Sequence, residues 1–231
     1  MIEQTGNNSR VITRRGLYRL PLDFDTIHQQ LLKAYKVEVA KRNYGQDKTQ
    51  ETPEISAMLN RTAQWLSTPT PKPFLVLMGN VGNGKTTMAK AVATLYSTLS
   101  NQASTENKNR GMLSEEERWL WDRLEIAPNW RMNTAQEVVT MSANAVEYPI
   151  IKTASNLILD ELGVEATSVK VFGTDTTPVI DLLLYRYEQM LPTIITTNLN
   201  PKEVEARYGT RIYDRIKEVG EVLCYTGASF R

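Results

Sequence analysis

The strongest chemical signal in the chain is the segment GNVGNGKT, which runs from Gly79 to Thr86. It satisfies the P-loop pattern, in which a glycine and four further residues precede Gly-Lys-Thr. Glycines let the backbone curl so that successive N–H groups point at phosphate oxygens. Lys85 can supply a positive charge to the β- and γ-phosphates, and the hydroxyl of Thr86 can bind Mg²⁺. The alternative explanation is a glycine turn without a ligand.

The surroundings of this segment favour phosphate binding. An apolar run of strand length, FLVLM at 74–78, precedes it, and apolar residues at helical spacing follow it from Met88 to Leu99. A helix that starts at the loop presents its N-terminus to an anion. We therefore predict that the chain binds ATP with Mg²⁺. The predicted nucleotide-binding residues are Gly79, Asn80, Val81, Gly82, Asn83, Gly84, Lys85, Thr86 and Thr87.

A second signal is NLILDELG, an apolar strand that ends in Asp160 and Glu161. A carboxylate at the carboxyl end of a strand, on the same sheet edge as the P-loop, can help to hold Mg²⁺, and its neighbour can orient an attacking water. Thr86 and Asp160 are thus the predicted metal ligands, and Glu161 is a predicted catalytic residue. A solvated strand end is the alternative.

Two weaker signals follow. Asn198 comes directly after the strand TIITT, where its amide could contact the γ-phosphate or the attacking water; it could also be an ordinary turn residue. Arg211 and Arg215 are four residues apart and share one helix face. An arginine offered to the γ-phosphate of a neighbouring subunit would stabilise the transition state, whereas a solvated basic face is the alternative.

Aromatic and basic residues alternate between positions 118 and 131. Such a pattern can stack on single-stranded DNA, but it is also typical of a packed helix. The residues are Arg118, Trp119, Trp121, Arg123, Trp130 and Arg131.

The order of apolar runs predicts an α/β fold. Two amphipathic helices are expected before residue 72, and strands then alternate with helices, which implies a parallel sheet covered by helices on both faces. We predict a helical N-terminal extension with its linker at 1–72 and the ATPase domain at 73–231. The polar residues 101–112 are expected to be mobile. The predicted strands are 74–78, 130–133, 156–160, 193–197 and 222–226.

The composition is that of a soluble globular protein, with 41% hydrophobic and 23% charged residues. A net charge of +1 gives no general attraction to nucleic acid. Neither a membrane-spanning apolar run nor a secretory signal is visible, so a cytoplasmic location is expected. The single cysteine, Cys224, excludes an internal disulfide and a cysteine-based metal site, and it is expected to lie in the core.

The motifs taken together resemble the ATPase domain of DnaC-type helicase loaders and IstB-type transposition helpers. The resemblance covers residues 73–231 and is carried by GNVGNGKTT, NLILDELG, LLLYRYEQMLPTIITTNL, RIYDRI and GASFR. It implies an AAA+-type, three-layer αβα fold with a five-stranded parallel sheet of order 5-1-4-3-2 and a reduced or absent helical lid. Asn198 would then be sensor 1 and Arg215 the arginine finger, with Arg186 as another candidate.

The same resemblance implies the partners: a replicative helicase or a transposase, DNA bound weakly as a single strand, and further copies of the chain in an ATP-dependent oligomer. Residues 101–130 depart from the family pattern as an insertion, and Arg231 would partly replace a sensor 2 arginine. A small-molecule kinase is the main alternative, although no basic lid segment is visible. A module that binds ATP without turnover is another.

Overall fold

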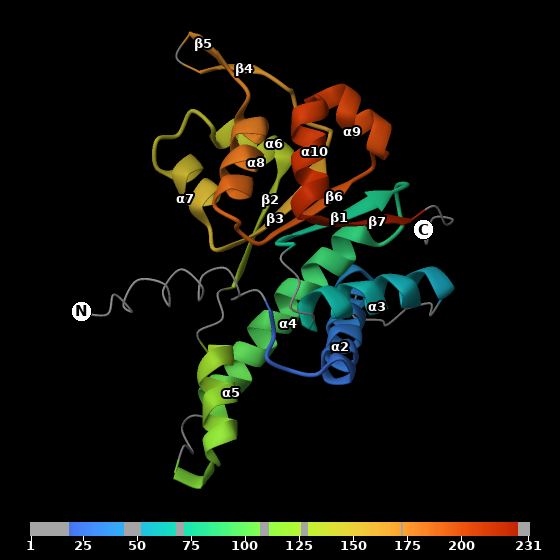
Figure 1. The fold of residues 1–231 in the computed structure, drawn as a ribbon, viewed down its shortest axis with the longest axis vertical. Helices are drawn as coiled ribbons and strands as arrows, with labels where there is room; N and C mark the ends of the chain where they lie inside the picture. The colour runs from blue at the N-terminus through green and yellow to red at the C-terminus, as the bar shows by residue number, and fades with distance from the viewer. Residues whose placement is uncertain are drawn as a thin grey trace, which may run out of the picture.

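A five-stranded parallel sheet forms the centre of the computed structural model, which describes residues 19–43, 52–67, 72–106, 111–125, 129–171 and 173–225 (Figure 1). The strand order within these residues is β2-β3-β6-β1-β7, which confirms the predicted order 5-1-4-3-2 once the strands of the main sheet are counted along the chain. The strands are β1 (Phe74–Gly79), β2 (Trp130–Thr134), β3 (Asn156–Leu162), β6 (Thr193–Thr197) and β7 (Gly220–Tyr225). The fold class is as predicted.

One face of the sheet is covered by the layer of helices that precede and follow the P-loop segment in the chain. Ile158, Ile194 and Leu223 share one apolar cluster with residues of these helices. Figure 1 shows the long helix α4 against the sheet and α2 and α3 packed beside it. The helices of this layer are α2 (Phe24–Arg42), α3 (Pro53–Ser67), α4 (Lys85–Glu106) and α5 (Glu115–Glu125).

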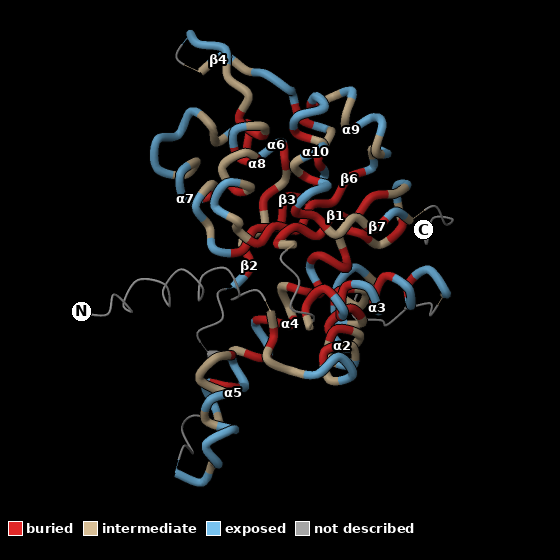
Figure 2. Tube along the Cα trace, viewed as in Figure 1, coloured by how far each residue is buried: buried red, intermediate tan, exposed pale blue. Residues whose placement is uncertain are grey.

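The opposite face is covered by shorter helices. Phe74, Leu159 and Ile195 point into a second apolar cluster on that side, because successive side chains of a strand alternate between its faces. Figure 2 shows that the buried residues concentrate along the sheet and the helix sides that face it. These helices are α6 (Ala135–Met141), α7 (Glu147–Thr153), α8 (Pro178–Glu188), α9 (Pro201–Tyr208) and α10 (Thr210–Val219).

Local sequence explains where several helices begin. Asp23 caps α2 by accepting from the N–H of Thr26 at 2.8 Å. Ser114 and Glu117 form the expected capping box before α5, since each side chain bonds the other residue's backbone N–H. The same reciprocal pair, Asn200 with Glu203, starts α9. Each of these caps satisfies N–H groups that have no partner inside the helix.

The structure differs from the sequence predictions at α4, at Cys224 and at the segment before α8. The helix after the P-loop is longer than the predicted segment from Met88 to Leu99, because α4 continues to Glu106. Cys224 is exposed rather than buried, since β7 is an edge strand. An antiparallel hairpin of β4 (Val169–Val171) and β5 (Thr174–Thr176) was not predicted. The domain division at residue 72 stays a prediction, and α2 and α3 share an apolar cluster with α4.

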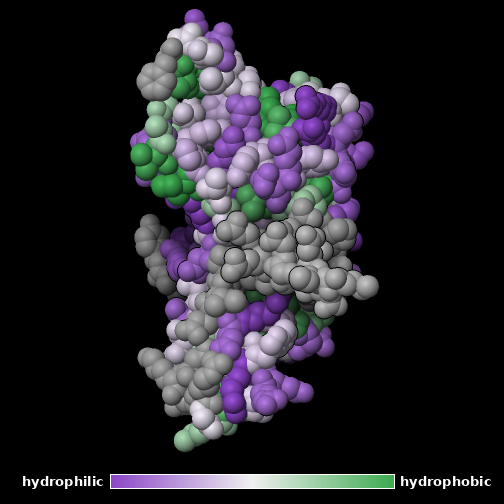
Figure 3. All heavy atoms as spheres, turned by 60° about the vertical axis from the view of Figure 1, so that its left-hand side comes forward, coloured by the Kyte–Doolittle hydropathy of each residue, from purple (hydrophilic) through white to green (hydrophobic). Residues whose placement is uncertain are grey.

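The exposed large apolar side chains are scattered over several elements. Trp119 and Met112 lie at the α5 end of the molecule, while Val146 and Ile150 lie on or beside α7. The face in Figure 3 is mostly hydrophilic, with separate hydrophobic areas between polar ones. No helix among the described residues is long and apolar enough to cross a membrane.

Candidate functional site

The P-loop lies where the sequence places it, between the end of β1 at Gly79 and the start of α4 at Lys85. Gly79, Gly82 and Gly84 have φ angles of 148°, 90° and 76°, in the region that favours glycine. A Cβ on Gly79 would stand 2.2 Å from the carbonyl oxygen of Tyr225. The side chain of Asn83 donates to the same oxygen at 3.2 Å. The P-loop therefore packs closely against the end of β7.

Lys85 brings the loop and the neighbouring strand together. Its Nζ donates to the carbonyl oxygens of Gly79 and Asn80 at 2.7 and 2.8 Å, and to Oδ1 of Asn198 at 3.0 Å. Burial lowers the pKa of Lys85, and the charge of Asp160 partly opposes this shift. The ammonium group is thus held over the loop by neutral oxygens, which are weaker partners for a cation than the oxygens of a phosphate.

Asp160 lies directly beside the first turn of α4. Its Oδ1 accepts from the hydroxyl of Thr86 at 2.9 Å and from the hydroxyl of Thr196 at 2.5 Å. A carboxylate and a hydroxyl next to a phosphate site are a donor set that suits Mg²⁺, which binds proteins through one or two carboxylates plus substrate phosphates. Thr86 and Asp160 therefore fit the magnesium ion that the sequence implies.

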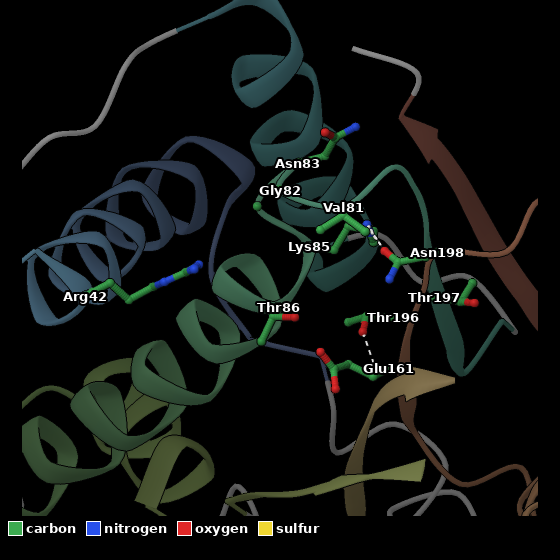
Figure 4. Close-up of a pocket in the computed structure, with 11 residues that line it drawn as sticks. Arg42, Val81, Gly82, Asn83, Lys85, Thr86, Glu161, Thr196, Thr197 and Asn198 are labelled. Atoms are coloured by element: carbon green, nitrogen blue, oxygen red, sulfur yellow. Dashed lines mark hydrogen bonds between the residues drawn. The ribbon is translucent and has the colours of Figure 1, made fainter. Parts of the chain in front are cut away.

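Glu161 has a different environment from Asp160, although the two are adjacent. Its side chain is exposed, and Figure 4 shows its carboxylate facing the pocket near Thr86. Its φ of 58° is rare for a residue other than glycine. The pairing of β3 with β6 is irregular between Leu159 and Leu162, and the N–H of Glu161 donates to the Thr196 hydroxyl at 3.0 Å. The Thr196 hydroxyl thus bonds both the carboxylate of Asp160 and the backbone N–H of Glu161.

One pocket unites most of the predicted binding and catalytic residues. It is lined by Arg42, Val81, Gly82, Asn83, Gly84, Lys85, Thr86, Glu161, Thr196, Thr197 and Asn198 (Figure 4). Gly79, Asn80, Thr87 and Asp160 stand behind this lining and contact it by hydrogen bonds. Sequence reasoning missed Arg42, Thr196 and Thr197. The threonines sit in the same TIITT segment as Asn198, so their place at the strand end was a signal, whereas nothing in the sequence pointed to Arg42.

The candidate finger Arg215 does not line this pocket. It lies on α10, half-buried, with its guanidinium 4.9 Å from the ring centroid of Tyr187. Arg211 is exposed on the same helix. Neither residue lines the pocket, and a role of either toward another subunit stays a prediction.

Arg186 is excluded as a residue that faces a neighbouring subunit. Its side chain is 0% exposed and donates to the Thr193 hydroxyl at 2.8 Å and to the carbonyl oxygens of Ala154 and Pro192 at 2.7 and 2.6 Å. Burial lowers the pKa of Arg186 to about 9, so the guanidinium remains charged at neutral pH. It joins the end of α7 to the start of β6.

Replacing Arg186 by methionine should therefore destabilise the fold by about 3 kcal/mol, because buried acceptors would lose their donors. Urea unfolding of the Arg186→Met and parent proteins measures this difference through the midpoint. Glu188→Gln, at an exposed position on the same helix, is the control and should change stability by less than about 0.5 kcal/mol. Equal midpoints for Arg186→Met and the parent would contradict the structural role.

The tryptophan and arginine residues near α5 do not form one surface. Trp130 is 8% exposed and packs against Trp65 and Tyr96, with ring centroids 6.2 and 5.7 Å apart. Arg131 pairs with Glu147 on the other side of the sheet. Trp119, in contrast, is 60% exposed, and the Arg123 guanidinium lies 5.8 Å from its ring centroid. The alternative of packing therefore holds for Trp130, whereas stacking on single-stranded DNA at Trp119 stays a prediction.

Known structures agree with the fold, although no family model and no curated protein sequence matches the chain. The crystal structure of the DnaC helicase loader superposes with a TM-score of 0.54 at 16% identity, covering 77% of this chain and 93% of that one. The protein has the AAA+-type P-loop fold of the DnaC helicase loader. A DnaI crystal structure is similar too, with a TM-score of 0.53, 18% identity, and coverage of 95% and 100%.

A putative primosome component from Streptococcus pyogenes serotype M3 shares this AAA+-type fold, with a TM-score of 0.50 and 19% identity over 95% of this chain and 98% of that one. The pocket lies at the carboxyl ends of the parallel strands, where open α/β sheets bind their ligands. After Asn198 the described residues of this AAA+-type fold form only α9, α10 and β7, so they include no separate helical lid.

Proposed function

We propose that the protein is an ATP-hydrolysing helicase loader. The observation that carries the proposal is the convergence of a cation, a hydroxyl and two acidic residues at the P-loop. Nζ of Lys85 donates to Oδ1 of Asn198 at 3.0 Å, and the hydroxyl of Thr86 donates to Oδ1 of Asp160 at 2.9 Å. Glu161 lines the same pocket. This set provides what phosphoryl transfer to water requires, namely charge neutralisation, metal binding and a group that orients water.

Each residue has a distinct part in the proposed reaction. Lys85 leaves the carbonyl oxygens of the loop and neutralises the β- and γ-phosphates. Thr86 and Asp160 hold Mg²⁺, which when bound stabilises the charge between those phosphates. Glu161 accepts a hydrogen bond from the attacking water, and Asn198 contacts the γ-phosphate or the same water. A kinase would instead need an acceptor site, and exposed Glu161 beside the γ-phosphate position favours water as the acceptor.

The partners belong to the same proposal. The likeness to a helicase loader suggests a replicative helicase as the target, and the sequence resemblance makes a transposase the second partner to test. ATP would order an interface between copies of the chain in the cytoplasm, and hydrolysis would release the partner.

Weak binding to single-stranded DNA is expected near Trp119. Fluorescence anisotropy of a labelled oligonucleotide at low salt tests it, and no binding with or without ATP would contradict it.

Calorimetric titration tests nucleotide binding. The parent should bind both ATP and ADP, and Lys85→Ala should weaken ATP binding about 100-fold, because a hydrogen bond to a charged group is worth roughly 1.5–3 kcal/mol. Steady-state phosphate release then distinguishes an ATPase from a module that binds without turnover. Equal ATP affinity of the two proteins would remove the P-loop from the proposal.

The loader function itself needs a test with the partner. With ATP present, a column that carries the immobilised protein should retain the replicative helicase of its source organism. A column that carries Lys85→Ala should not retain it. A purified helicase should then load onto single-stranded DNA faster when the protein and ATP are both present. Failure to change helicase loading, with ATP turnover intact, would contradict this function and leave the ATPase assignment standing.

A further inference from the structure

Helix α2 ends at the nucleotide pocket, although it belongs to the segment before the P-loop domain. Its last residue, Arg42, lines that pocket, and its Nη1 donates to the hydroxyl of Thr87 at 3.0 Å. Thr87 lies in the first turn of α4, directly after the P-loop threonine. The hydroxyl that accepts from Arg42 is therefore part of the predicted phosphate-binding segment.

The positive charge of Arg42 is not neutralised by the nearest acidic side chain of its own helix. Glu38 is 7% exposed and its carboxylate already accepts from Nζ of Lys41 and from the Thr94 hydroxyl, both at 2.6 Å. The charge of Lys90 acts on Glu38 as well. Among the described residues, no carboxylate lies within ion-pair distance of Arg42, and its hydrogen-bond partner is the neutral Thr87 hydroxyl. Arg42 is exposed, so its remaining donors are free to bind an anion in the pocket.

We propose that Arg42 binds the phosphate chain of the nucleotide in the same subunit, at its α- and β-phosphates. The residues that mark the γ-phosphate are Asn198 and Glu161, and Figure 4 shows Arg42 reaching the pocket from the opposite side. The planar guanidinium offers donors in addition to the one used by Thr87, and it suits two phosphate oxygens at once. This inference rests on the proposed nucleotide binding.

A consequence distinguishes Arg42 from a sensor of the γ-phosphate. ADP and ATP share the α- and β-phosphates, so removal of Arg42 should weaken both by the same factor. A charge-assisted hydrogen bond is worth roughly 1.5–3 kcal/mol, which corresponds to a loss of about 10- to 100-fold in affinity. Because α2 packs along α4, a nucleotide held by Arg42 and the P-loop would also join these two helices more firmly.

Calorimetric titrations of ADP and ATP into Arg42→Met, Arg42→Lys and the parent test the proposal. Methionine keeps much of the apolar stem, and lysine keeps the charge without the planar fork. Arg42→Met should raise both dissociation constants about 10-fold or more, by equal factors, and Arg42→Lys should be intermediate. Lys33→Met is the matched control, because Lys33 is exposed on the same helix and does not line the pocket. It should bind as the parent does.

Three results would overturn the inference. Parent-like ADP and ATP affinities of Arg42→Met would show that the guanidinium is no phosphate ligand. A loss confined to ATP would place Arg42 at the γ-phosphate, and an equal loss in Lys33→Met would assign the effect to general charge. Melting temperatures without nucleotide verify that each variant is folded. If the parent itself binds neither nucleotide, the proposed function fails instead.

Discussion

Replacing Glu161 by glutamine should slow ATP turnover by about 10²- to 10⁴-fold, the usual contribution of a general base. The amide retains the size of the carboxylate but cannot accept a proton from water. The backbone would stay in place, because the N–H of Glu161, and not its side chain, is bonded to Thr196. ATP affinity should therefore change little, and the variant should accumulate in an ATP-bound state.

Asp160→Asn supplies the contrast, since the two acidic residues are neighbours with different contacts. Asp160 accepts from Thr86 and Thr196 and is 5% exposed, so its replacement should weaken Mg²⁺-dependent ATP binding as well as turnover. Single-turnover hydrolysis and calorimetry separate the two effects. Parental turnover in Glu161→Gln would assign the catalytic carboxylate to another residue.

Replacing Arg215 by alanine should remove the part of ATP turnover that depends on contact between subunits. Arginine fingers contribute on the order of 10³–10⁵ in rate. Arg215 is half-buried, lies outside the pocket and packs on the ring of Tyr187, with its guanidinium 4.9 Å from the ring centroid. A trans-acting Arg215 must therefore leave this ring to reach a phosphate of the neighbouring subunit.

The measurement is steady-state ATPase activity over a wide range of protein concentration. Activity per subunit should rise with concentration for the parent and stay low for Arg215→Ala, while the ATP affinity of the monomer is unchanged. A mixture of Arg215→Ala and Lys85→Ala should regain activity, because one supplies an intact site and the other an intact arginine. Arg211→Ala, on the same helix, tests the other candidate arginine by the same design. Flat activity of the parent under oligomer-forming conditions would contradict the trans-acting role.

The sequence predicted the sheet and most of the pocket because both depend on local patterns. Apolar runs of strand length, each followed by a turn or a helix start, predicted the five strands, and the resemblance to DnaC-type and IstB-type ATPases implied their order. The P-loop and the pair Asp160–Glu161 are short motifs whose residues lie at strand ends, where a parallel sheet brings them together. Capping boxes such as Ser114 with Glu117 are equally local.

The errors concern residues whose roles depend on distant contacts. Arg186 sits in a helix that looks amphipathic, and only the folded chain shows that three carbonyl oxygens from other segments surround its guanidinium. Arg42 belongs to a helix that is separated from the P-loop along the sequence, so no motif includes it. Cys224 lies in an apolar run, but an edge strand leaves part of such a run uncovered.

The contact between the P-loop and β7 also bears on how the chain is made. Asn83 and the carbonyl oxygen of Tyr225 are 142 positions apart, and Gly79 lies against that same oxygen. A growing polypeptide has therefore synthesised its whole P-loop long before the strand that shapes it exists. Pairing of such distant segments is intrinsically slow. The ability to hold a nucleotide should thus arise late in biosynthesis, and premature ATP binding by an incomplete chain is disfavoured.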